Sequence, residues 1–408
     1  MVEANRRRLP AFLAAFAFPS FRRLWTGAFL SSVGNWIQDV ALAWIIHTRF
    51  GDPLYLGLRA FASDAPLLTF MLLGGAVADR VDRRFILLTS QVLQMLLAVV
   101  LGLLWVTGRL GIEAILLVAF VTGLAQSQSA PTYQAVLTSV VPKDHIPNAV
   151  ALNSLQFNLS RAVGPVIAGA LLARGGTTAC FAVNALSFLA VIFAIWRITI
   201  PPHAAAPTES LARSLGTGLR HVTNSPILST LTMLGAVGSF LAFPLITYLP
   251  VFAGDVLRTG VTGYSLLLTS FGTGAILGAV TTAHRGNVPG RGRRLLLAMI
   301  VYGVVTAGAM ACRDQRAAMA LLVLSGISMI TAFSTLNSLV QENAPDALKG
   351  RILSIYGLAF RGGLPLGALL AGALVRPFGV PLVIGAFSVG VAVLAAGTLV
   401  WNQRVRSL

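Results

Sequence analysis

Twelve runs of mainly apolar residues divide this chain, and each is long enough to cross a lipid bilayer as one helix. About 20 helical residues span roughly 30 Å of hydrocarbon. The runs cover residues 24–46, 54–78, 85–107, 112–131, 148–173, 177–196, 227–251, 262–283, 295–312, 317–340, 352–375 and 380–400. Of the 408 residues, 56% are hydrophobic and 11% are charged, which no water-soluble domain of this size shows. Because the sequence lacks the alternation over about 10 residues of membrane β-strands, it predicts an all-α membrane protein with twelve transmembrane helices.

The basic residues cluster between the apolar runs and favour one side of the membrane. The formal net charge is +17, but the clusters form no continuous basic face with interleaved aromatic residues, so nucleic acid is not expected as a partner. With the N-terminus placed inside, twenty of the 30 Lys and Arg residues fall in inner segments, eight in outer segments and two within helices. Because inner loops carry the excess of positive charge, we expect a multi-pass protein of the cytoplasmic membrane with both termini cytoplasmic.

The first residues raise the alternative of a signal peptide. Three arginines precede a short apolar run, but Pro19, Arg22 and Arg23 follow it where a mature start is expected. A cytoplasmic segment leading into the first helix fits better.

The sequence repeats itself after half its length. With a common shift of 203 residues, GAV at 75–77 recurs at 278–280, Pro142 corresponds to Pro345, and GALLARGG at 169–176 corresponds to GALVRPFG at 372–379. Matches at one offset favour two pseudo-symmetric six-helix halves. We expect these halves at 1–197 and 224–408.

The residues between the halves, 198–223, are expected to form a cytoplasmic linker. It opens with a polar, proline-rich break. It continues with apolar residues on one helical face: Leu211, Leu215, Leu219 and Val222. This spacing predicts a short amphipathic helix on the inner membrane surface.

The inner loop after the second run contains GGAVADRVDRR at 74–84. This stretch resembles motif A of the major facilitator superfamily, a G-x-x-x-D-R-x-x-R-R pattern. FRRLWTGAFLSSVGNWIQDVALAW at 21–44 and PNAVALNSLQFNLSRAVGP at 147–165 are similar to the branch with enterobactin-type siderophore exporters and macrolide or multidrug efflux proteins. The resemblance covers the whole chain and implies the major facilitator fold.

Motif A suggests a conformational lock at the inner membrane surface. Its candidate residues are Gly75, Asp79, Arg80, Arg83 and Arg84. The glycine allows close helix contact, and the arginines donate to nearby carbonyls and carboxylates. The resemblance implies that Asp79 faces the N-terminus of the eleventh helix, whose dipole favours an anion. A plain basic loop is the alternative, but it leaves the acids unexplained.

The fifth run contains SRAVGPVIAG at 160–169, which resembles motif C of proton-coupled exporters. Pro165 cannot donate to the carbonyl of Arg161, and Pro365 stands in the same relation to Arg361, so both helices are expected to bend. The hinge candidates are Gly164, Pro165, Gly169 and Pro365. Ordinary packing kinks are the alternative.

Four ionisable residues lie deep within predicted spans: Asp39, Asp64, Arg161 and Arg361. Counting 1.5 Å per residue places them about 15–22 Å from the inner helix ends, where an unpaired charge costs at least about 3 kcal/mol. In the resembled fold, Asp39 can pair with Arg161 and Asp64 with Arg361. We expect these residues to couple transport to protons; static pairs, or Asp64 facing water at the outer mouth, are alternatives. The fourth run, 112–131, lacks the arginine of motif B.

Polar and aromatic side chains on the predicted helices suggest a mixed cavity for large amphipathic compounds. The candidates are Asn35, Trp36, Gln38, Gln126, Asn153, Phe157, Asn158, Asn337, Tyr356 and Phe360. A sugar site would favour denser polar pairs, and an anion site would present several cations.

The sequence favours a transporter over an enzyme. Cys180 and Cys312 stand alone and the five histidines are scattered, so no disulfide, metal site, cofactor or catalytic cluster is expected. We expect a monomer in the lipid bilayer that exports a hydrophobic or amphipathic small molecule by alternating access, against inward proton flow. A lipid translocator or an uptake permease of the same fold is the alternative, because fold does not fix direction or cargo.

Overall fold

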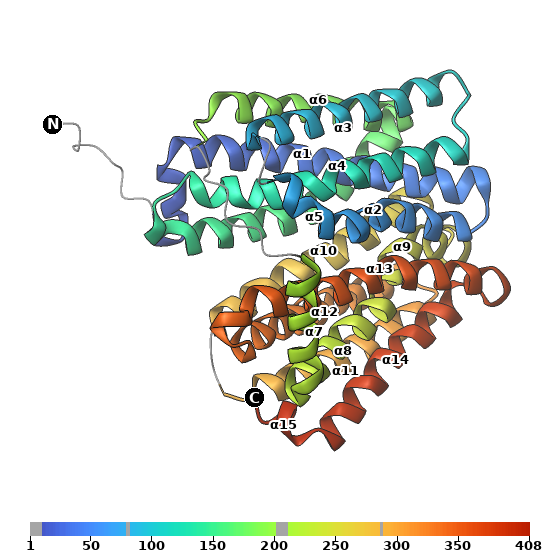
Figure 1. Ribbon diagram of the computed structural model, residues 1–408. Coiled ribbons are helices and arrows are strands. Elements are labelled where there is room, and N and C mark those ends of the chain that lie inside the picture. Colours follow the sequence, from blue (N-terminus) through green and yellow to red (C-terminus); the bar gives the residue numbers. More distant parts are fainter. Residues whose placement is uncertain (1–9, 79–81, 201–210, 286–288) are drawn as a thin grey trace. The chain divides into compact units, whose positions relative to one another are not determined.

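Helices make up the regular structure of the described chain, as the computed structural model shows (Figure 1). The structure describes residues 10–78, 82–200, 211–285 and 289–408. Within this part, eleven helices are long and apolar enough to cross a membrane. The predicted span 54–78 is not among the eleven; it corresponds to helix α2, in which the side chains of 70–78 are outside the described set. The predicted all-α membrane class is confirmed.

Fifteen α-helices and five short 3₁₀ or π segments follow one another along the described chain. In chain order they are η1 (Ala11–Ala17), α1 (Pro19–Ile45), η2 (Ile46–Phe50), α2 (Leu54–Ala78), α3 (Arg83–Val106), α4 (Ile112–Ser139), η3 (Lys143–His145), α5 (Ile146–Arg174), α6 (Gly176–Arg197), α7 (Leu211–Asn224), α8 (Pro226–Ala242), α9 (Pro244–Val251), η4 (Phe252–Val256), α10 (Gly260–Arg285), α11 (Arg291–Ala311), α12 (Gln315–Asn343), η5 (Asp346–Leu348), α13 (Lys349–Phe378), α14 (Val380–Trp401) and α15 (Gln403–Arg406).

Contacts group the chain into two compact units. Unit 1 consists of Met1–Ala41 and Thr69–Pro207, and unit 2 consists of Leu42–Leu68 and Thr208–Leu408. Residues 42–68, which include the end of α1 and the start of α2, therefore pack with helices from the second half of the sequence.

The internal repeat has a structural counterpart at the same offset. The 3₁₀ turn η3 begins at Lys143 and η5 begins at Asp346, and each follows one of the matched prolines. The long helices that come next, α5 and α13, begin at Ile146 and Lys349. Both pairs of starting residues are 203 positions apart, so the two halves repeat the same turn and helix.

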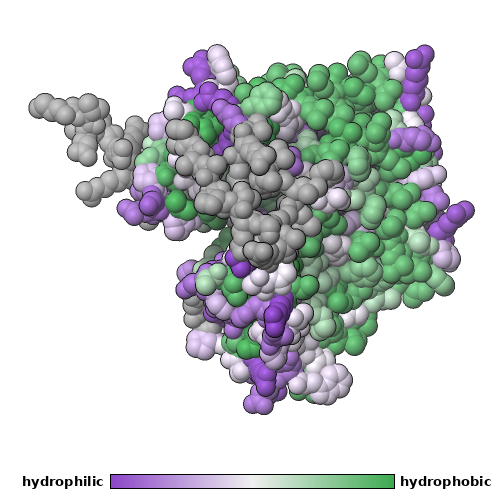
Figure 2. All heavy atoms as spheres, viewed as in Figure 1, coloured by the Kyte–Doolittle hydropathy of each residue, from purple (hydrophilic) through white to green (hydrophobic). Residues whose placement is uncertain are grey.

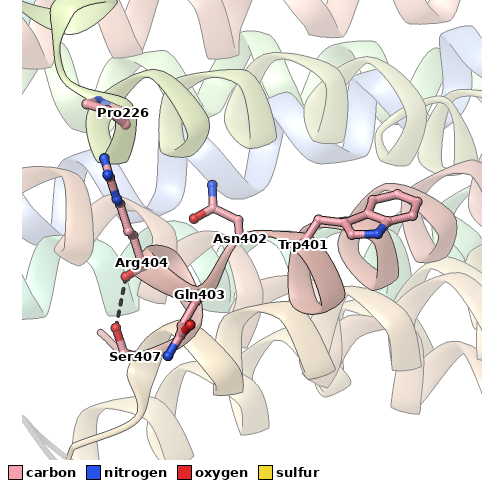
Figure 3. A pocket seen from close by; sticks show the side chains of 6 residues that line it. All are labelled: Pro226, Trp401, Asn402, Gln403, Arg404 and Ser407. Carbon is pink, nitrogen blue, oxygen red and sulfur yellow. Dashed lines mark hydrogen bonds between the residues drawn. The ribbon is translucent and has the colours of Figure 1, made fainter.

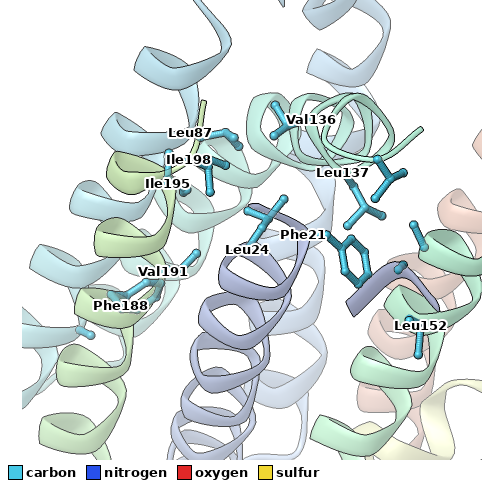
Figure 4. Packing of buried hydrophobic residues seen from close by; sticks show 14 residues of the cluster. Phe21, Leu24, Leu87, Val136, Leu137, Leu152, Phe188, Val191, Ile195 and Ile198 are labelled. Atoms are coloured by element: carbon cyan, nitrogen blue, oxygen red, sulfur yellow. The ribbon is translucent and has the colours of Figure 1, made fainter. Parts of the chain in front are cut away.

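The core of unit 1 gathers apolar side chains from several helices (Figure 4). Phe21 and Leu24 of α1 are fully buried, and they lie among Leu87 of α3, Val136 of α4 and Phe188 of α6. Burial of aromatic and aliphatic side chains at close packing holds the ends of these helices together.

The seventh predicted span, 227–251, is built of two helices. α8 ends at Ala242 and α9 starts at Pro244. Pro244 has no N–H to donate to the carbonyl of Phe240. Gly367 of α13 lies against that carbonyl so closely that a Cβ there would overlap with the Phe240 oxygen. The break between α8 and α9 therefore rests on two residues. Pro244 leaves the Phe240 carbonyl without its helical donor, and Gly367 lets α13 approach that carbonyl.

Within the predicted linker, the described chain forms α7, which packs on the start of α13. Gly218 lies against the backbone of Arg351, to which a Cβ would approach within 3.0 Å of the carbonyl oxygen. Val222 is buried, whereas Leu219 is 52% exposed.

Apolar side chains cover much of the surface as well. Figure 2 shows a broad hydrophobic area on the face in view. Leu103, Phe193, Val304 and Val393 are between 55% and 64% exposed. Such a surface is expected where helices face lipid instead of water.

Candidate functional site

Arg161 lies on α5 between two aromatic rings of unit 1. Its Cζ atom is 5.5 Å from the centre of the Trp36 ring and 5.4 Å from that of the Phe157 ring. Its Nε is buried and has no hydrogen-bond partner among the described residues. Because aromatic faces attract a guanidinium without using its N–H donors, Arg161 is a positioned cation that can still donate hydrogen bonds.

The contact between α1 and α5 brings Trp36 to this arginine. Gly164, three residues after Arg161, lies directly against Trp36: a Cβ on Gly164 would overlap with the Trp36 Cβ and lie 3.3 Å from the Val33 oxygen. Pro165 is buried in the same turn. The predicted hinge residue Gly164 thus has an observed packing role, while bending during transport stays a prediction, as it does for Pro165, Gly169 and Pro365.

Other buried polar atoms lie on α4 and α5. Gln128 Oε1, the Tyr133 hydroxyl and Asn153 Oδ1 have no hydrogen-bond partner among the described residues. Buried polar atoms are normally satisfied. Asn153, Phe157 and Arg161 follow at intervals of four residues and therefore share one side of α5. These helices offer donors and acceptors that a bound molecule or water can satisfy.

Some predicted cavity residues have structural partners instead. Gln38 Oε1 accepts a hydrogen bond of 2.9 Å from Asn184 Nδ2, which ties α1 to α6. Asn158 Nδ2 donates to the Ser154 carbonyl of its own helix. Gln126 and Asn337 are exposed, and Asn35 is half-buried. Asn184 is fully buried, and the sequence interpretation missed it because a lone asparagine in an apolar run carries no partner information.

A second aromatic cluster lies in unit 2, beside the break between α8 and α9. The ring centres of Phe243, Phe333 and Phe360 are 5.3–5.6 Å from one another, and Tyr356 lies 6.0 Å from Phe360. The Ser239 hydroxyl donates to the Phe360 carbonyl at 2.7 Å. Tyr356 and Phe360 were predicted, whereas Phe243 and Phe333 were not. The proline directly after Phe243 was the available signal.

The structure does not decide whether the deep charges form the predicted ion pairs. Arg161 makes the two ring contacts. Arg361 is exposed. Both acids are half-buried. A role of these four residues in proton coupling therefore stays a prediction.

Motif A is described only in part. Gly75 lies within α2, and Asp79 and Arg80 lie outside the described residues. Arg84 Nη2 donates a hydrogen bond to the carbonyl of Ile198, just after α6. Asp82 caps α3 by accepting from the Arg84 backbone N–H at 2.7 Å. Arg84 thus ties the start of α3 to the end of α6, and the lock between Asp79 and the eleventh span stays a prediction.

Close backbone packing joins α2 to α9 and α13 within unit 2. A Cβ on Gly57 would lie 2.6 Å from the Ala368 oxygen and 2.8 Å from the Tyr248 hydroxyl. That hydroxyl donates to the same Ala368 oxygen at 2.7 Å. Gly57 therefore allows α2 to reach a buried hydrogen bond between α9 and α13.

Two polar pairs also join residues 47–52 to other segments of unit 2. Asp52 Oδ2 lies 3.6 Å from Arg376 Nη1, and His47 Nε2 lies 3.5 Å from Asp255 Oδ1. Pairs with exposed members contribute about 0–1 kcal/mol, so they can form and separate readily. Sequence reasoning missed both pairs, because their members are more than 200 positions apart.

The hollow drawn in Figure 3 lies at the C-terminal end, next to Pro226 and Arg404. Asn402 there is committed to structure: it caps α15 by accepting from Val405 N at 3.1 Å and donates to the Thr230 hydroxyl at 3.0 Å. The Ser407 hydroxyl donates to the Arg404 carbonyl. In this hollow, Asn402 and Ser407 therefore serve the local structure.

A family profile described as "transmembrane secretion effector" matches residues 11–408. The chain belongs to the transmembrane secretion effector family. Its relatives include the staphyloferrin A transporter of Staphylococcus aureus, 26% identical over 87% of this chain and 89% of the relative. The multidrug efflux pump Tap of Mycolicibacterium fortuitum is 26% identical over 99% of this chain and 98% of the relative. The enterobactin exporter EntS of Escherichia coli is 23% identical over 87% of this chain and 85% of the relative.

Among solved structures, the nucleoside transporter NupG is similar with a TM-score of 0.75 and 14% identity, covering 94% of this chain and 99% of that one. This likeness shows the fold. The predicted major facilitator fold, and the resemblance to the siderophore and multidrug efflux branch, are therefore confirmed. This member of the secretion effector family is a multi-pass membrane transporter and not an enzyme.

Proposed function

We propose that this transporter exports a hydrophobic or amphipathic small molecule, of a drug-like or siderophore-like class, from the cytoplasm. The family supports it, because relatives are named as a siderophore transporter, a siderophore exporter and a multidrug efflux pump. The observation that carries the proposal is Arg161, a buried guanidinium held between Trp36 and Phe157 with an unused donor. Aromatic faces beside a polar group bind amphipathic compounds of varied shape.

Transport is proposed to proceed by alternating access. The contacts of residues 42–68 with α9, η4 and α13 support this, because they combine close glycine packing with weak polar pairs. Such contacts close one end of a pathway without a large energetic barrier to opening. Asp79, with Arg80, is proposed to hold the other end through the N-terminus of the eleventh span.

Proton antiport is proposed to drive export. Asp39 and Asp64 are half-buried acids within spans. Burial raises the free energy of a charged carboxylate relative to the neutral form, so an acid that alternates between environments can bind and release a proton. The proposed transporter is a monomer with both termini in the cytoplasm.

The decisive experiment measures compound accumulation in an efflux-deficient bacterium that expresses this chain. A panel of drugs and siderophore precursors identifies the cargo, and we expect lower accumulation of at least one class. An Arg161→Gln variant is measured in the same panel. Arg174→Gln, on the same helix, serves as its matched control, because Arg174 is exposed. Unchanged accumulation throughout the panel contradicts the proposal.

Direction is tested separately in energised membrane vesicles. Inverted vesicles should take up the cargo, while right-side-out vesicles should not. Uptake by right-side-out vesicles indicates a permease, and movement of labelled phospholipid between leaflets indicates a lipid translocator.

A further inference from the structure

A cavity of about 300 Å³ lies between α10, α11 and α12 of unit 2. Arg294 lines it at one end, and Leu297 and Val301 of α11 line it with Ile327 of α12. Arg294 stands in the first turn of α11, and Val301 is seven residues further along, about 10 Å deeper. The cavity therefore runs from a cation near the helix end into an apolar region.

Three of the five hydroxyl groups in the lining, those of Thr281, Thr282 and Ser328, donate to carbonyls of their own helices. Thr282 donates to the Gly278 carbonyl at 2.7 Å, and Ser328 donates to the Leu324 carbonyl at 2.8 Å. Each hydroxyl is thereby satisfied by its own helix. The wall is thus suited to hydrocarbon, and Arg294 supplies the positive charge.

The floor of the cavity is closed by backbone contact between α10 and α12. A Cβ on Gly278 would lie 2.6 Å from the Ile327 oxygen, and a Cβ on Gly326 would overlap with the Phe271 oxygen. No side chain or ligand fits between helices that approach so closely. An occupant must therefore come from the outer side of these helices.

That outer side is apolar. Leu297 and Val301 are 42% and 46% exposed, and Leu277 and Val280 on α10 are 46% and 56% exposed. In a membrane-spanning protein these side chains face lipid. The cavity thus opens onto the bilayer, with Arg294 near the level of the headgroups.

Nearby charges favour an anion there. Glu342 is paired with Arg291 through both carboxylate oxygens, so its charge is compensated. Arg293 is exposed next to Arg294. An arginine at a helix end beside the interface attracts lipid phosphate.

We propose that this cavity binds an anionic phospholipid, with one acyl chain along Leu297 and Val301 and the phosphate at Arg294. The proposal is independent of cargo and direction; the proposed orientation assigns the lipid to the inner leaflet. Arg294 and the apolar wall together give the site its preference for an anionic lipid over a zwitterionic one.

Native mass spectrometry of the purified full chain tests the site. Phosphatidylglycerol and phosphatidylcholine with the same acyl chains are titrated in parallel, and we expect wild type to retain phosphatidylglycerol preferentially. Arg294→Gln should weaken phosphatidylglycerol binding about fivefold, as expected for one interfacial cation. Arg293→Gln, one position away and not lining the cavity, should bind like wild type.

A second variant separates the cavity from the surface charge. Ala298→Trp fills the cavity from α11 and should reduce binding of phosphatidylglycerol while Arg294 is intact. Thermal unfolding in detergent confirms that each variant is folded. If Arg294→Gln is not folded, the phosphatidylglycerol binding of Ala298→Trp and Arg293→Gln decides whether the lipid occupies the cavity.

Several results overturn the proposal. They are equal retention of both lipids by wild type, unchanged phosphatidylglycerol binding in Arg294→Gln or in Ala298→Trp, and an equal loss in Arg293→Gln. Displacement by inorganic phosphate at matched concentration would show a simple anion site, and displacement by transported cargo would assign the cavity to the transport pathway.

Discussion

Gly164 of α5 lies so close to Trp36 of α1 that a Cβ on the glycine would overlap with the tryptophan Cβ. The same Trp36 ring faces the guanidinium of Arg161. The glycine of the motif C-like stretch therefore sets the distance between the two helices that carry the candidate site. Its effect on the site is steric, through the position of the ring.

Replacing this glycine should disturb the site. Gly164→Ala forces α1 and α5 apart or shifts Trp36, which costs about 1–3 kcal/mol for an added methyl group in a packed contact. We expect a lower Tm and weaker cargo binding. Gly385→Ala on α14 is the control, because a Cβ there meets nothing within 4 Å. Equal behaviour of the two variants contradicts the packing role.

Variants of Arg161 and Phe157 should distinguish the role of the positive charge from the role of the ring contacts. Arg161→Lys keeps a positive charge but loses the planar guanidinium, and Phe157→Leu removes one ring. Loss of a cation–π contact of about 0.5–2 kcal/mol leaves the guanidinium less firmly positioned in the free protein, so we expect lower cargo affinity. Equilibrium binding to purified variants measures this, with Arg174→Lys as control. Unchanged affinity in both Arg161→Lys and Phe157→Leu would move the cargo site elsewhere.

The sequence predicts the helices better than their contacts. Lipid satisfies no backbone hydrogen bonds, so a membrane crossing must be a helix or a strand of a closed barrel. In a chain without the strand pattern, the crossings are long apolar runs that can be counted. Depth in the membrane also follows from position along a helix, which is how Arg161 was found. The rotation of a helix does not follow from depth, so the position of Arg161 between the Trp36 and Phe157 rings was not predicted.

Contacts between distant segments were harder still to foresee. His47 and Asp255 come together although nothing in their local sequence connects them. Phe243 and Phe333 are two of 22 phenylalanines in an apolar chain, where composition cannot separate a cluster from lipid-facing rings. Tertiary packing selects among many equivalent apolar positions.

The arginines of motif A should differ in effect. Arg84 donates to the Ile198 carbonyl, and loss of a hydrogen bond from a charged donor costs about 1.5–3 kcal/mol. We expect Arg84→Ala to lower the Tm more than Arg83→Ala, since no hydrogen bond of the Arg83 side chain is recorded in the described chain. A larger loss in Arg83→Ala would mean that the bond to Ile198 is not the anchor.

Widening the glycine contact of α2 should open that end of unit 2. In Gly57→Ala the new methyl group would lie 2.6 Å from the Ala368 oxygen, so α2 must withdraw from α13. A cysteine introduced at Leu369, in a background without Cys180 and Cys312, should then react faster with a water-soluble maleimide. Gly362→Ala on α13 has free space around its Cβ and should leave the rate unchanged. An unaltered rate in Gly57→Ala would show that this contact does not control access.

The last prediction concerns energy coupling and rests on Asp39, a half-buried acid three residues after Trp36 on α1. A proton carrier must be charged in one state of the transport cycle and neutral in another, because burial without compensation favours the neutral carboxyl group. Asn cannot change charge and holds the position neutral. Asp39→Asn should therefore abolish export driven by a proton gradient while cargo binding is retained, and Asp64→Asn should act in the same direction. Reconstituted vesicles with an imposed gradient measure export, and binding is measured separately on the purified variants. Full gradient-driven export by the Asp39→Asn, Asp64→Asn double variant would place the proton site on other residues.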